Sequence, residues 1–112
     1  AQDRRAQALT LEGMTQGHDA ALFPIQRLFF YLPLEHAEDL AAQEQSVAAF
    51  TRLRDEAPMT LKDDCEGFLD YAIRHRKVIA RFGRFPDLNI MLGRDSTLEE
   101  WAFLREPGSS FL

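Results

Sequence analysis

The residues best suited to chemistry form a group of carboxylates and imidazoles. Glu35, His36, Glu38 and Asp39 lie close together in the chain, and His75 is the next histidine after them. On a helix, residues three or four positions apart share a face, where carboxylate and imidazole groups can relay a proton or bind a metal. However, the Glu-x-x-His spacing of di-iron bundles is absent, and acidic residues are also favoured at the positive end of a helix. We therefore expect a structural network of caps and buried histidine hydrogen bonds, with no metal, and keep a metal or catalytic site as the alternative.

A second group contains three arginines and a serine. Arg81, Arg84 and Arg94 precede Ser96, which we expect to open a helix. Helix N-termini bind phosphate and guanidinium groups add bidentate contacts, so these residues are a candidate anion site. The alternative is that the arginines pair with carboxylates nearby in the chain and pack on phenylalanine rings.

The composition restricts the class of protein. The chain has 112 residues, 46% hydrophobic and 28% charged, which is typical of one soluble globular domain over residues 1–112. Lys and Arg number 13 against 18 Asp and Glu, and the resulting charge of minus 5 repels phosphate backbones, so we expect no nucleic-acid partner. Cys65 is the single cysteine, which excludes an internal disulfide, and no cofactor is indicated. Because no membrane span or signal peptide is visible, we expect a cytoplasmic protein without a membrane partner.

The elements that must position these groups are helices. Five Pro and six Gly fall almost entirely between segments with three–four apolar spacing. This spacing predicts helices over about residues 3–16, 24–32, 34–57 and 61–83. Pro33 is expected to end the second helix, and a capping box from Ser96 to Glu99 is expected to open a short last helix before Pro107. We predict an all-α fold, a compact stack of four or five antiparallel helices.

Two longer segments carry a family resemblance. Residues 29–38 read FFYLPLEHAE, and residues 81–104 contain RFGRFP, LGR, STLEE and FL in that order. These strings resemble the signature segments of the bacterial domain-of-unknown-function 924 family, and residues 106–111 resemble its usual ending. The resemblance covers nearly all of this chain but only the C-terminal part of the longer family members. It implies tetratricopeptide-like helical hairpins and brings no established reaction.

The departures from the family pattern are mostly apolar and fall in one short stretch. Asp87 and Leu88 stand where the family has His and Arg, which weakens the anion site by removing positive charge. Leu98 stands where the family has Pro. We predict a protein-binding patch that consists of Leu88, Ile90, Met91, Leu98 and Trp101. An aromatic anchor surrounded by Leu and Met is typical of a binding hot spot, and the alternative is that Trp101, Ile90 and Leu92 complete the core.

We therefore interpret the chain as a non-enzymatic helical scaffold that binds another protein, with the patch engineered onto a natural family member. Self-association through the same patch is the second interpretation. A small-molecule, anion or metal site around Glu35, His36 and His75, or around Arg84 and Arg94, is the third. Exposure of the patch side chains supports the binding interpretation, and their burial in the core contradicts it.

Overall fold

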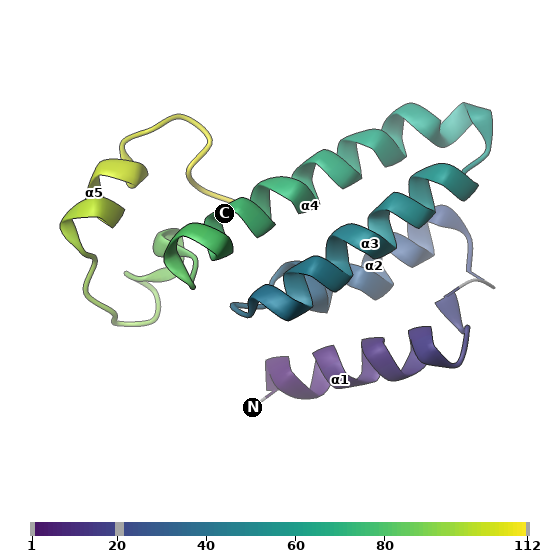
Figure 1. Ribbon diagram of the computed structural model, residues 1–112, viewed down its shortest axis with the longest axis horizontal. Helices are drawn as coiled ribbons and strands as arrows, with labels where there is room; N and C mark the ends of the chain where they lie inside the picture. Colours follow the sequence, from purple (N-terminus) through teal and green to yellow (C-terminus); the bar gives the residue numbers. More distant parts are fainter. Residues whose placement is uncertain (1, 20–21, 112) are drawn as a thin grey trace.

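The chain folds into helices and turns alone across the residues that the structure describes, which are 2–19 and 22–111. In this computed structural model the α-helices are α1 (Gln2–Thr15), α2 (Pro24–Glu35), α3 (Leu40–Glu56), α4 (Lys62–Phe82) and α5 (Leu98–Leu104), as Figure 1 shows. Two short 3-10 helices, η2 (Met59–Leu61) and η3 (Pro86–Leu88), precede and follow α4. The predicted all-α stack of four or five helices is therefore confirmed. None of the helices in the described ranges has the length and apolar character to cross a membrane.

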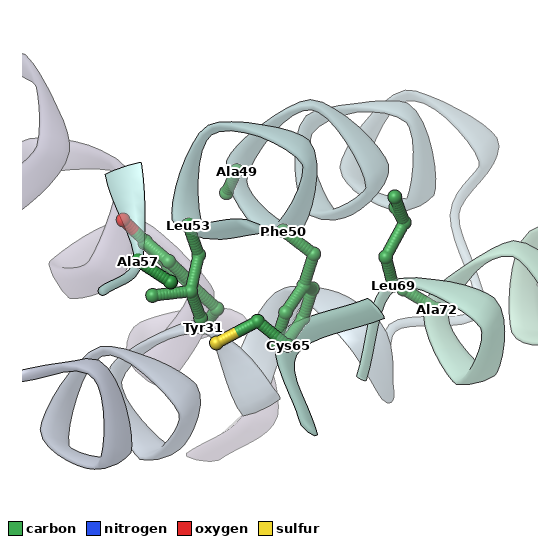
Figure 2. Packing of buried hydrophobic residues seen from close by; sticks show 8 residues of the cluster. All are labelled: Tyr31, Ala49, Phe50, Leu53, Ala57, Cys65, Leu69 and Ala72. Carbon is green, nitrogen blue, oxygen red and sulfur yellow. The ribbon is translucent and has the colours of Figure 1, made fainter. Parts of the chain in front are cut away.

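The core lies where α2, α3 and α4 pack against one another. Its buried members are Tyr31, Ala49, Phe50, Leu53, Ala57, Cys65, Leu69 and Ala72 (Figure 2). The rings of Tyr31 and Phe50 meet edge to face, with centroids 5.5 Å apart. The Tyr31 hydroxyl donates to the Asp19 carboxylate and accepts from Arg27 Nε at 3.2 Å, so this buried polar group is satisfied. Cys65, Leu69 and Ala72 of α4 face this core at three–four spacing, and the thiol of Cys65 is buried.

The second helix continues through Pro33, which the spacing predicted to end it. α2 runs to Glu35, and the next helix begins after Asp39, whose carboxylate accepts a backbone amide at 2.9 Å. The prediction that a helix starts at residue 34 is therefore wrong. Pro33 has no N–H group, so α2 lacks the single hydrogen bond from residue 33 to the Phe29 carbonyl, and the helix continues through the proline. In consequence Glu35 and His36 lie at the C-terminal end of α2. The attraction of acidic residues to the positive end of a helix therefore does not explain the position of Glu35.

α4 ends in a left-handed cap, and α5 begins with a capping box. Gly83 has a φ of 73°, which glycine adopts without strain, and it turns the chain towards α5. The Thr97 hydroxyl accepts from the Glu100 amide at 3.1 Å, and the Glu100 carboxylate accepts from the Thr97 amide at 2.9 Å. The predicted box at Ser96 is wrong by one residue, because the Ser96 hydroxyl instead accepts a hydrogen bond from the Asn89 side chain.

The molecule is elongated for its size, with extents of 44 × 31 × 19 Å. α5 lies beyond one end of α4, away from α1, α2 and α3 (Figure 1). The solvent-accessible surface is 7195 Å², against about 6300 Å² for a compact monomer of this mass. The radius of gyration is 14.8 Å, whereas a compact domain of this length has a radius of about 13 Å. More surface therefore contacts solvent than a single compact domain of this size requires.

Candidate functional site

Several large apolar side chains of α5 and of the loop before it are exposed. Both segments lie at one end of the molecule (Figure 1). The exposed fraction is 90% for Leu98, 82% for Ile90, 71% for Met91 and 48% for Trp101. Leu92, which the predicted patch did not include, is 57% exposed. These five residues form the surface that we call the 90–101 patch. The alternative that Trp101, Ile90 and Leu92 complete the core is wrong, because none of these three side chains is buried.

Leu88 differs from the other residues of the predicted patch. Its side chain is partly buried and packs against a small cluster made of Val78, Ile79, Phe85 and Phe103. The residue lies in η3, which directs it towards the end of α4 rather than towards solvent. The structure therefore places Leu88 at the edge of the core and outside the 90–101 patch.

Two arginines fasten the loop that carries the patch. Arg84 donates to both carboxylate oxygens of Glu100, at 2.9 and 2.7 Å, which ties the end of α4 to α5. Arg94 donates to both oxygens of Glu38, at 2.8 and 2.9 Å, which ties the loop to the segment between α2 and α3. Both pairs are bidentate, and this geometry gives an arginine–carboxylate pair its strength and its directionality. The loop is therefore held from two sides.

The same arginines keep both carboxylates ionised. Hydrogen bonds from Arg84 lower the pKa of Glu100 from 4.5 to about 2. Partial burial acts to raise the pKa of Glu38, but the hydrogen bonds from Arg94 and from the Phe85 amide outweigh it and hold the pKa below its ordinary value. Both pairs therefore stay charged at neutral pH and well into the acid range.

The predicted anion group of Arg81, Arg84, Arg94 and Ser96 is engaged within the protein. Arg81 Nε lies 3.5 Å from a Glu99 carboxylate oxygen, and its guanidinium lies over the Phe82 ring, 4.6 Å from the centroid. An anion at this place must displace carboxylates that are already bound to the arginines. The arginines therefore have a structural role in this fold, and the anion site stays a prediction.

The polar cluster predicted near the end of α2 divides into two parts. Two of its members, Glu38 and Asp39, are used in the arginine pair and the helix cap already described. The remaining three come together, and one ligand-type atom each of Glu35, His36 and His75 lies within 4.8 Å of the other two. Glu35 and His75 are buried, whereas His36 is exposed. The carboxylate and the two imidazoles thus meet between the end of α2 and the middle of α4.

Burial keeps the two inner groups of this cluster uncharged. His75 Nδ1 lies 2.8 Å from the Tyr71 carbonyl oxygen, which can only accept, so Nδ1 carries the proton and Nε2 the lone pair. Burial lowers the pKa of His75 from 6.5 to about 4 and raises the pKa of Glu35 from 4.5 to about 7. The Glu35 carboxyl group lies 3.6 Å from His75 Nδ1. Between about pH 4 and pH 7, therefore, both groups are neutral in the folded chain.

A cavity of about 520 Å³ opens beside the cluster, a volume within the usual range for small-molecule sites. Its lining includes Phe29, Leu32, Pro33, His36, His75, Phe85 and Phe111. The Phe111 ring stacks on the His75 ring with centroids 3.7 Å apart, and the Phe111 amide donates to the Asp87 carboxylate at 2.9 Å. Asp87, one of the departures from the family pattern, therefore anchors the C-terminal tail against the cavity. No local sequence signal indicated this contact.

The opposite pKa shifts of Glu35 and His75 predict an unusual dependence of stability on pH. Between pH 4.5 and 6.5 the unfolded chain ionises Glu35 and protonates His75, whereas the folded chain keeps both neutral. Unfolding then releases one proton and takes up another, so these two groups contribute no net slope. In Glu35→Gln only the uptake by His75 remains, and the free energy of unfolding should rise by about 2 kcal/mol as the pH increases from about 4.5 to 6.5.

Urea unfolding at several pH values measures this dependence in both chains. Glu35→Gln should show the steeper rise with pH. If the free energy of unfolding has the same pH dependence in the original chain and in the variant, Glu35 is already ionised in the folded state, and the prediction is wrong.

The helices and the site define an all-α protein built from antiparallel helices, with a buried carboxylate–histidine cluster and an exposed apolar end. Residues 1–108 match the model of the family described as bacterial protein of unknown function (DUF924). The chain therefore belongs to this family, as the resemblance implied. The solved structure of the protein of unknown function ATU0120 from Agrobacterium tumefaciens is similar, with a TM-score of 0.76 and 37% sequence identity. The match covers 94% of this chain and 53% of that chain, so this chain spans about half the length of its solved relative. No curated protein gives a significant match.

Proposed function

We propose that this chain is a helical protein-binding module whose partner covers the 90–101 patch. The observation that carries the proposal is the exposure of five large apolar side chains at one end of the molecule, Ile90, Met91, Leu92, Leu98 and Trp101. Soluble monomers rarely leave such groups of side chains in water unless a second molecule covers them.

The chemistry of the patch limits the partner. Burial of Met91, Leu98 and Trp101 stabilises a complex by about 1.5 to 3 kcal/mol each, which is enough for micromolar affinity after the costs of association. The arginine pairs at Glu38 and Glu100 already hold the loop, so little further ordering is needed on binding. A net charge of minus 5 opposes the pairing of two copies of this chain. We therefore propose a different polypeptide with an apolar surface and a neutral or basic charge.

Two narrower parts of this proposal rest on the sequence. The inference that the patch is engineered depends on its apolar departures from the family pattern, whereas binding depends on the exposure of the side chains. A cytoplasmic location likewise stays a prediction from the sequence. Neither part is needed for the binding proposal.

Patch variants test the proposal directly. Leu98→Asp changes the most exposed member of the patch, and Met59→Asp is the matched control because Met59 is 84% exposed in η2, at the other end of α4. A partner captured by the original chain should bind Leu98→Asp about tenfold to a hundredfold more weakly in calorimetric titrations, and bind Met59→Asp unchanged. Equal binding by all three chains would contradict the proposal. Light scattering at two concentrations measures the molar mass and distinguishes a monomer that binds a partner from a chain that self-associates. We expect a monomer.

A further inference from the structure

The cluster of Glu35, His36 and His75 has the donor set of a metal site. One carboxylate and two imidazoles bring donor atoms within 4.8 Å of one another, from the end of α2 and the middle of α4. Two histidines and one carboxylate bind divalent ions such as zinc while leaving further coordination positions open. The patch and its partner make no use of these three residues.

The hydrogen bonding of His75 suits a ligand. Its Nδ1–H group donates to the Tyr71 carbonyl at 2.8 Å, which fixes the tautomer and leaves the lone pair on Nε2. Metal-binding histidines usually donate their second ring N–H to a carbonyl or carboxylate in this way. Stacking of Phe111 against the face of the ring further fixes its orientation and leaves the ring edge unobstructed by that contact. His75 therefore offers Nε2 to a cation, whereas its protonated Nδ1 is the nitrogen that lies 3.6 Å from the Glu35 carboxyl group.

The Glu35 carboxyl group is buried without a strong cationic partner. Within residues 2–19 and 22–111, no lysine or arginine forms a salt bridge with it, and His75 Nδ1 lies 3.6 Å from a carboxyl oxygen. This arrangement differs from that of Glu38 and Glu100, each of which is bound by an arginine in bidentate geometry. A bound metal ion would take the place of the carboxyl proton and supply the positive charge that no lysine or arginine of the described residues supplies to Glu35.

We propose that Glu35, His36 and His75 bind one first-row divalent metal ion, of the type of Zn²⁺, at the wall of the 520 Å³ cavity. In a tetrahedral site the ligand atoms lie about 3.3 Å apart, so the present arrangement must contract by about 1 to 1.5 Å. The exposed His36 side chain moves towards the other two ligands, and the Glu35 carboxyl group, now 3.6 Å from Nδ1 of His75, turns towards Nε2. Both histidines line the cavity, so the remaining coordination positions are accessible to water or to a small oxygen or nitrogen donor.

Titration with Zn²⁺ and Co²⁺ tests this site. The original chain should bind one Zn²⁺ in calorimetry, melt at a higher temperature with the metal, and give visible absorption with Co²⁺. His36→Ala should weaken binding by at least about tenfold. His18→Ala is the matched control, since His18 is the third histidine of the chain, is exposed and lies outside the cluster, and it should bind the metal like the original chain.

Two further variants keep the test decisive. Glu35→Gln removes a ligand without removing side-chain volume and should also lose the Co²⁺ absorption. Leu98→Asp should keep full metal binding, because the 90–101 patch contributes no ligand, so this site and the binding surface can fail independently. Absence of a stoichiometric Zn²⁺ site in the folded chain would overturn the inference, as would equal weakening by His36→Ala and His18→Ala.

Discussion

Replacement of Phe50 with alanine should lower the free energy of unfolding by about 4 kcal/mol. Phe50 is fully buried in α3, and its ring meets Tyr31 of α2 edge to face at 5.5 Å. It belongs to the cluster in which α2, α3 and α4 pack together, so its removal leaves a cavity that all three helices border. Urea unfolding at neutral pH measures the loss.

Phe29 provides the matched control for this prediction. Its side chain is 65% exposed, so Phe29→Ala should change the free energy of unfolding by less than about 1 kcal/mol. Similar losses in Phe29→Ala and Phe50→Ala would show that the core is not centred where α2, α3 and α4 meet.

Replacement of Glu38 with alanine should destabilise the protein by about 3 kcal/mol. The Glu38 carboxylate accepts two hydrogen bonds from Arg94 and a third, at 2.7 Å, from the Phe85 amide. It is therefore the point where the segment between α2 and α3 holds the 85–94 loop. Without it Arg94 keeps its charge in a partly buried place and loses its carboxylate partner.

Hydrogen exchange distinguishes this local effect from general unfolding. Glu38→Ala should expose the amides of the loop before α5 to faster exchange than those of α3 and α4. Glu99→Ala is the control, since its pair with Arg81 is solvent-exposed and contributes less than about 1 kcal/mol. If the loop amides exchange equally in the Glu38 and Glu99 variants, the carboxylate does not fasten the loop.

The sequence predicts those parts of the fold whose signals are local. The three–four spacing in α4 and the glycine after it determine that helix almost to the residue, and Gly83 provides the left-handed cap. The prediction that Pro33 ends the second helix is wrong because the free-energy cost of a proline in a helix depends on the packing around it, and here the last turn of α2 stays helical. The start of α5 shifts by one residue because Asn89 uses the Ser96 hydroxyl, a contact that no capping rule contains.

The site is less accessible to sequence reasoning because its contacts are distant in the chain. Glu38 and Arg94 are 56 positions apart, and nothing in their local sequence distinguishes them from surface charges. The departures from the family pattern also assigned Leu88 to the patch and omitted Leu92, although Leu92 is exposed and Leu88 is partly buried. Only the fold decides which member of a loop contacts the core. The family resemblance supplied the architecture, but it carried no reaction and no partner.

The central claim is that a second polypeptide covers the 90–101 patch, and a fluorine label at Trp101 tests it most directly. The chain contains one tryptophan, so incorporation of fluorotryptophan gives a single ¹⁹F resonance at the patch. The change of its chemical shift between H₂O and D₂O reports the exposure of the indole, which is 48% in the free chain. We predict that the bound partner shifts the resonance and abolishes most of this solvent effect. A partner that binds this chain and leaves both the resonance and its solvent effect unchanged would contradict the account.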